Sequence, residues 1–153
     1  MSGTGFTTAV SVESGRFDQW GRFAAGGSER AVLSALGELI GFPIRPVRLR
    51  VSDGSRVELD GASADASAVV QLPLRGGEFT SAHRNKIMAD MFKLTWVRSV
   101  AAPHAHALLC VSSTSAGAFR PGSWLARAAA DMRVTVFVWS EDALTHAAGP
   151  ALS

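Results

Sequence analysis

The chain has 153 residues, of which 47% are hydrophobic and 18% charged, a composition typical of one globular domain and not of a disordered chain. Fifteen Lys and Arg side chains against 13 Asp and Glu give a net charge of only +2, too small to indicate nucleic-acid binding by itself. Cys110 is the single cysteine, so the chain can form no internal disulfide and no cysteine-based zinc site, and it lies in an apolar run.

The N-terminus shows no basic stretch followed by an apolar core, so the sequence does not predict a secretory signal. No apolar run approaches the roughly 20 residues needed to cross a bilayer. We therefore expect a cytoplasmic protein with no membrane partner.

Residues 1–27 are rich in Gly, Ser and Thr but carry scattered aromatic side chains: Phe6, Phe17, Trp20 and Phe23. Aromatic residues are unusual in an inert tail. We expect a flexible or docking segment that contacts its own domain, a second copy in a homodimer, or a larger protein complex.

The remaining chain is expected to form one domain over residues 28–140, followed by a C-terminal tail over 141–153. Hydrophobic periodicity and turn signals predict helices over 28–40, 80–98 and 123–131, and strands over 46–51, 56–60, 68–74, 105–111 and 133–139. A meander of strands followed by helical crossovers (order αβββαβαβ) predicts an α/β protein with a central mixed β-sheet flanked by helices.

Polar residues recur at particular places in this order. Asp60 ends the second predicted strand, Gln71 lies on the third, and the long helix carries Lys86, Asp90 and Lys93. The arrangement resembles the PD-(D/E)XK nuclease superfamily over roughly residues 30–139, and its Lys-x3-Asp-x2-Lys-Leu run is similar to that of small bacterial nuclease-like proteins. The resemblance implies a restriction-endonuclease-like core.

In that family, acidic residues on two adjacent strands hold a divalent cation that stabilises charge on a phosphodiester. The resemblance places Asp60 at the first acid and Gln71 at the second, with Glu38 from the first helix as a further ligand of Mg²⁺ or Mn²⁺. Gln71 is neutral and so a poorer ligand, and Pro73 occupies the position of the family's lysine. The catalytic motif is therefore degenerate.

Some members of the family move the lysine to the neighbouring helix, which makes Lys86 and Lys93 the candidates for replacing it. Arg75, Arg84 and Lys86 are the candidates for binding nucleic acid. Simpler interpretations stand beside these: a turn at Asp60, ion pairs on a solvated helix face, or a solvated row of arginines.

Two functions remain open from the sequence. The first is a catalytically degenerate PD-(D/E)XK-like protein that acts as a nucleic-acid-binding or assembly subunit and needs no cofactor. The alternative is a divalent-metal-dependent DNA nuclease with a variant active site. Losing the second carboxylate and the lysine together favours the first.

Overall fold

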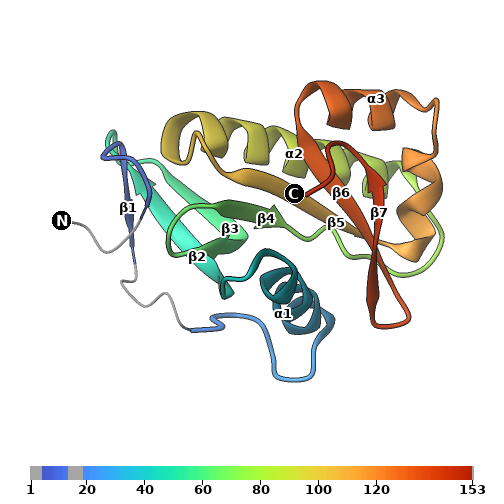
Figure 1. The fold of residues 1–153 in the computed structure, drawn as a ribbon, viewed down its shortest axis with the longest axis horizontal. Helices are drawn as coiled ribbons and strands as arrows, with labels where there is room; N and C mark the ends of the chain where they lie inside the picture. Colours follow the sequence, from blue (N-terminus) through green and yellow to red (C-terminus); the bar gives the residue numbers. More distant parts are fainter. Residues whose placement is uncertain (1–4, 14–18, 153) are drawn as a thin grey trace.

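A seven-stranded β-sheet forms the centre of the computed structural model, which describes residues 5–13 and 19–152 (Figure 1). Its strands are β1 (Val10–Val12), β2 (Ile44–Val51), β3 (Arg56–Ser63), β4 (Ala68–Gln71), β5 (His106–Ser112), β6 (Val134–Ser140) and β7 (Ala143–Ala148). The helices are α1 (Ser28–Ile40), α2 (Ser81–Ala101), α3 (Trp124–Asp131) and the 3-10 helix η1 (Ser113–Phe119).

The strands lie in the sheet in sequence order, from β1 to β7. The pairs from β1 to β4 are antiparallel, β4, β5 and β6 run parallel to one another, and β7 returns antiparallel to β6. Because parallel neighbours need a crossover, α2 connects β4 to β5 and α3 lies between β5 and β6. The expected mixed sheet flanked by helices is confirmed.

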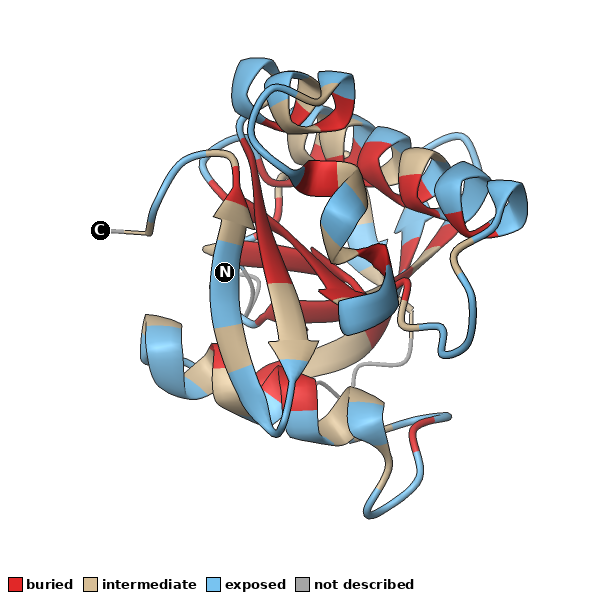
Figure 2. Cartoon of the chain, turned by 90° about the vertical axis from the view of Figure 1, so that its right-hand side faces the viewer, coloured by how far each residue is buried: buried red, intermediate tan, exposed pale blue. Residues whose placement is uncertain are grey.

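The two faces of the sheet are covered by different helices. Leu108 and Cys110 of β5 belong to the same buried cluster as Leu33 of α1, whereas Leu109 clusters with Leu94 of α2. The central strands are buried on both faces, as Figure 2 shows, which explains the continuous apolar run in β5. Alternating side chains of one strand thus join two separate layers of core.

Local signals placed most boundaries to within one residue. The exceptions are that β2 begins two residues before 46, β3 runs three residues past its expected end at Asp60, β4 stops three residues short of 74, and α2 continues three residues past 98. The hairpin between β2 and β3 turns at Gly54, whose φ of 98° is accessible to glycine, and the Asp53 carboxylate accepts the N–H of Ser55 at 2.8 Å. Helix α2 begins after Thr80, whose hydroxyl caps the N–H of His83. Strand β4 ends two residues before Pro73, which cannot donate a ladder hydrogen bond.

The described part of the N-terminal segment docks on its own domain. Strand β1 pairs with β2, while Phe6 and Phe23 are buried on opposite sides of the sheet. Phe17 lies outside the described residues. Docking on a second copy or on a larger complex stays a prediction.

The C-terminal residues differ from the expected tail, because 143–148 form strand β7 against β6. Glu141 and Asp142 make the connecting turn, with φ values of 52° and 59°. Two successive positive φ values close a tight hairpin of the type usually made by Asn-Gly or Asp-Gly. The turn at 141–142 is Glu-Asp and not one of those pairs, so the sequence gave no recognisable signal for the last hairpin.

Candidate functional site

Four of the polar residues singled out in the sequence meet at one pocket of about 440 Å³ beside the middle of the sheet. Asp60 comes from β3, Gln71 from the end of β4, and Lys86 and Lys93 from α2. These residues are brought together because β3 pairs with β4 and α2 follows directly from β4. The charged side chains that line the pocket are Arg22, Glu29, Glu58, Asp60, Lys86 and Lys93.

Asp60 is the most buried of the lining carboxylates that form ion pairs, with a side chain 16% exposed. Its Oδ2 accepts the N–H of Leu72 at 2.8 Å, and its Oδ1 accepts from the guanidinium of Arg22. Burial raises the pKa of the Asp60 carboxyl above its ordinary value, although the Leu72 N–H and Arg22 act in the opposite direction. The neighbouring Gly61 leaves room for α1, since a Cβ there would lie 2.7 Å from Leu33.

Gln71 connects the strand to the helix through both ends of its amide. Its Oε1 accepts the N–H of Asp60 at 2.9 Å, and its Nε2 donates to Oδ1 of Asp90 at 3.0 Å. The reversed amide would set donor against donor and oxygen against carboxylate, so the chemistry of the two partners fixes this orientation. A glutamine here is matched to Asp90, because a carboxylate at the same position would face a second carboxylate.

Asp90 is only 1% exposed, which the interpretation of a solvated helix face did not anticipate. Its Oδ1 also accepts from Nζ of Lys86 at 2.8 Å, whereas Oδ2 is buried and accepts no hydrogen bond from the described residues. Lys93 donates to the backbone carbonyl of Glu58 at 3.2 Å. Both lysines are thus held by groups of their own chain.

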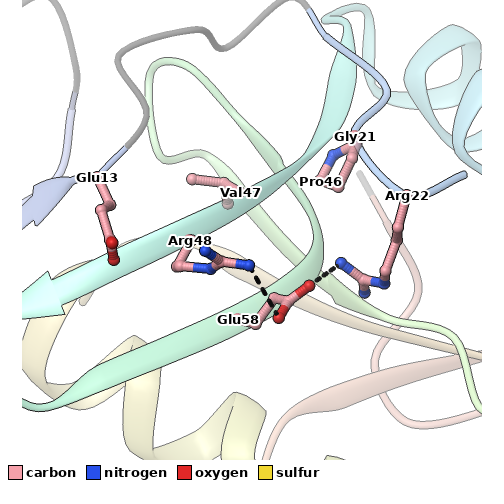
Figure 3. A pocket seen from close by; sticks show the side chains of 7 residues that line it. All are labelled: Glu13, Gly21, Arg22, Pro46, Val47, Arg48 and Glu58. Atoms are coloured by element: carbon pink, nitrogen blue, oxygen red, sulfur yellow. Dashed lines mark hydrogen bonds and ion pairs between the residues drawn. The ribbon is translucent and has the colours of Figure 1, made fainter.

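Arg22, Glu29 and Glu58 also line this pocket, although the sequence did not indicate them. The Arg22 guanidinium bridges the carboxylates of Glu58 and Asp60, which share one face of β3 because they are two residues apart. Glu58 also contacts Arg48 at 3.7 Å, across an adjoining hollow of about 380 Å³ (Figure 3). Period-two spacing could have revealed Glu58 as a companion of Asp60, but no local signal points to Arg22.

Other candidates lie away from the pocket. Glu38 borders a different hollow beside the C-terminal end of α1, and the first turn of the helix contributes Glu29 to the pocket instead. These two glutamates are about 13 Å apart along the helix axis. Arg84 stacks on Phe79, with its guanidinium carbon 5.6 Å from the ring centroid, and Arg75 does not line the pocket.

A divalent cation needs available oxygen ligands, and the present arrangement offers few. Gln71 Oε1 already accepts a hydrogen bond, and the Arg22 guanidinium, itself a cation, contacts both Asp60 and Glu58. Within 5–13 and 19–152, no three Asp, Glu, His or Cys side chains gather as a metal-binding group. To bind Mg²⁺ or Mn²⁺, Asp60 would therefore have to exchange the Arg22 guanidinium for the cation.

The fold and the pocket define a mixed α/β protein with a pocket of charged side chains, several of them paired with one another, beside strands β3 and β4 and helix α2. Comparisons of the chain with protein-family models, with curated proteins and with solved structures found no match. In the part of the chain that the structure describes, no helix is both long and apolar enough to span a membrane.

Proposed function

We propose that this protein is a catalytically degenerate PD-(D/E)XK-like chain, with a restriction-endonuclease-like core, that acts as a binding subunit for nucleic acid or within a larger assembly. The observation that carries the proposal is how Gln71 and Arg22 are engaged. Gln71 braces β3 against α2, and Arg22 supplies the positive charge that a metal would bring to Asp60. Residues at the family's catalytic positions thus stabilise the fold.

The electrostatics of the pocket agree with this proposal. Three basic and three acidic side chains line it, and the ion pairs among them leave little net charge to attract a phosphate without a cation. Pro73 offers no amine, and the two lysines of α2 are bonded to Asp90 and to a backbone carbonyl. A phosphodiester at this pocket would therefore meet no lysine amine that is free of a bond to the chain itself.

The second candidate is a divalent-metal-dependent DNA nuclease with a variant active site. It is favoured by one observation, namely that Asp60, Gln71, Lys86 and Lys93 line the same pocket. Catalysis would require Arg22 to leave Asp60 and the Gln71 oxygen to turn toward the pocket. Arg22 is free to move in part, since its side chain is 43% exposed.

The two candidates are separated by incubating the purified protein with linear, nicked and single-stranded DNA in Mg²⁺ or Mn²⁺. We expect all three substrates to remain intact, identically for the wild type and for Asp60→Ala. Asp131→Ala is the matched control, because that carboxylate is exposed on α3 and distant in sequence from the pocket. Cleavage that disappears in Asp60→Ala but persists in Asp131→Ala would overturn the proposal.

A further inference from the structure

Helix α2 carries a net positive charge. This helix carries the basic residues Arg84, Lys86, Lys93 and Arg98 against one acid, Asp90, a net charge of +3 compared with +2 for the whole protein. All residues of α2 are described by the structure, and its one acid is buried. Every charged side chain that α2 presents to solvent is therefore basic.

The same helix exposes two aromatic rings to solvent. Phe92 is 73% exposed and Trp96 is 38% exposed, and the four-residue spacing places them on one face, about 6 Å apart along the axis. The exposed positions that continue this face carry smaller side chains, namely Ala82, Asn85, Ala89 and Ser99. The two rings therefore project beyond their neighbours on the helix.

Basic side chains flank this aromatic face on both sides. At 100° per residue, Arg84 lies about 80° to one side of Phe92 and Lys86 about 80° to the other side of Trp96, both toward the N-terminal end of α2 and about 12 and 15 Å away along the axis. The Lys86 side chain is 47% exposed although its amine contacts Asp90. Exposed rings with cationic groups on the same helix are a combination that binds unpaired bases and their phosphates.

We propose that the outer face of α2 binds single-stranded nucleic acid, with bases stacked on Phe92 and Trp96 and phosphates beside Arg84 and Lys86. The inference rests on the proposed function and names the partner class and the surface. The binding surface is the outside of α2, and the Asp60 pocket serves as its structural support. Strand polarity and base identity are not specified by stacking, so binding is tolerant of sequence.

Charge and geometry favour this occupant over the others. A second copy docked through α2 would set one basic face against another, which is unfavourable. An acidic peptide would match the positive charge. It would use Phe92 and Trp96 only as apolar area, however, and would have no need of aromatic ring faces. Duplex DNA keeps its bases stacked on one another, so it offers phosphates to Arg84 and no free base to the rings.

The test measures fluorescence anisotropy of labelled oligo-dT and oligo-U of about 16 nucleotides, within the range of single-stranded sites of small binding domains. We expect Phe92→Ala and Trp96→Ala each to weaken binding about tenfold, the effect of losing one stacked base. Trp96→Leu should weaken it similarly, whereas Trp96→Phe should retain most of the affinity. Arg84→Ala should lower the slope of log affinity against log salt by about 0.7.

Trp124→Ala is the matched control, because this tryptophan is 58% exposed on α3 and outside the aromatic face. It should bind like the wild type. Three results would each overturn the proposed stacking: an affinity in Trp96→Ala equal to that of the wild type, an equal affinity for single strands and for a duplex, or a retained affinity in Trp96→Leu. A wild type that binds no oligonucleotide would also overturn it. The proposed function is overturned by a different result, namely Asp60-dependent cleavage.

Discussion

The pocket at Asp60 and the outer face of α2 adjoin each other but differ in how far their side chains are already bonded. In the pocket, Asp60, Gln71 and Lys86 all have hydrogen-bonding partners within the chain. On the outer face, Phe92 and Trp96 remain open to solvent. The residues that resemble a catalytic motif are thus committed to structure, and the open surface lies where the motif gave no indication.

A side chain that joins two elements of the fold uses its polar groups inside the chain. Gln71 illustrates this, since its amide bonds β3 to α2. A surface that binds a partner, by contrast, leaves groups unsatisfied in the free protein.

The largest expected effect comes from placing a carboxylate at position 71 with Gln71→Glu. The new carboxylate would lie beside buried Asp90 and lose the donor that Asp90 now receives, so we expect a loss of about 2–4 kcal/mol in unfolding free energy at neutral pH. Guanidinium denaturation measures this change. Gln19→Glu, at an exposed position, is the control and should change little.

The pH dependence of Gln71→Glu checks the cause. Two carboxylates in contact share one proton, which raises the pKa of the pair and makes the protonated form the stable one. The loss of stability should therefore be small in acid and should grow as pH rises through that pKa. An equal loss at every pH would show that the glutamine acts by shape alone.

A smaller effect is expected from Arg22→Ala. The guanidinium lowers the pKa of Asp60, which burial already raises above the ordinary value of 3.8, so removing it should raise that pKa further. Because the folded pKa is the higher one, the protonated carboxyl stabilises the fold below 3.8, and this contribution is lost as pH rises through the folded pKa. In the variant, the pH range over which this stabilisation is lost should extend to higher pH.

Carboxyl NMR titration of Asp60 measures this shift directly. Since Arg22 is 43% exposed, its ion pairs should contribute less than about 1 kcal/mol to stability. Arg127→Ala removes an exposed pair with Asp131 on α3 and should leave the titration of Asp60 unchanged. An unmoved Asp60 pKa in Arg22→Ala would mean that the guanidinium does not neutralise this carboxylate in solution.

The interior of the fold was predictable because each part of it leaves a local trace. Alternation gave β2 and β3, an apolar run gave β5, and Gly41 in the left-handed conformation ended α1. The outer strands β1 and β7 were not predictable. Three residues of β1 depend on pairing with β2, and the turn before β7 uses residue types that rarely adopt positive φ.

The site was predictable where one element sets the spacing and not where distant segments meet. Asp60, Gln71, Lys86 and Lys93 converge as the order of elements implied. Arg22 could not be anticipated, because its partners lie 36 and 38 residues away and no periodicity connects them. For α1, the resemblance pointed to Glu38, but the sequence could not tell that the other end of the helix, with Glu29, lines the pocket.

The smallest expected effect concerns the aromatic face itself. Phe92→Ala should change unfolding free energy by no more than about 0.5 kcal/mol, because the ring is 73% exposed and alanine is the better helix former. Leu94→Ala, two residues away and fully buried, should cost about 2–5 kcal/mol in the same denaturation experiment. A large loss in Phe92→Ala would instead mean that the ring packs on the rest of the chain. A small loss would show that the ring contributes little to the stability of the fold.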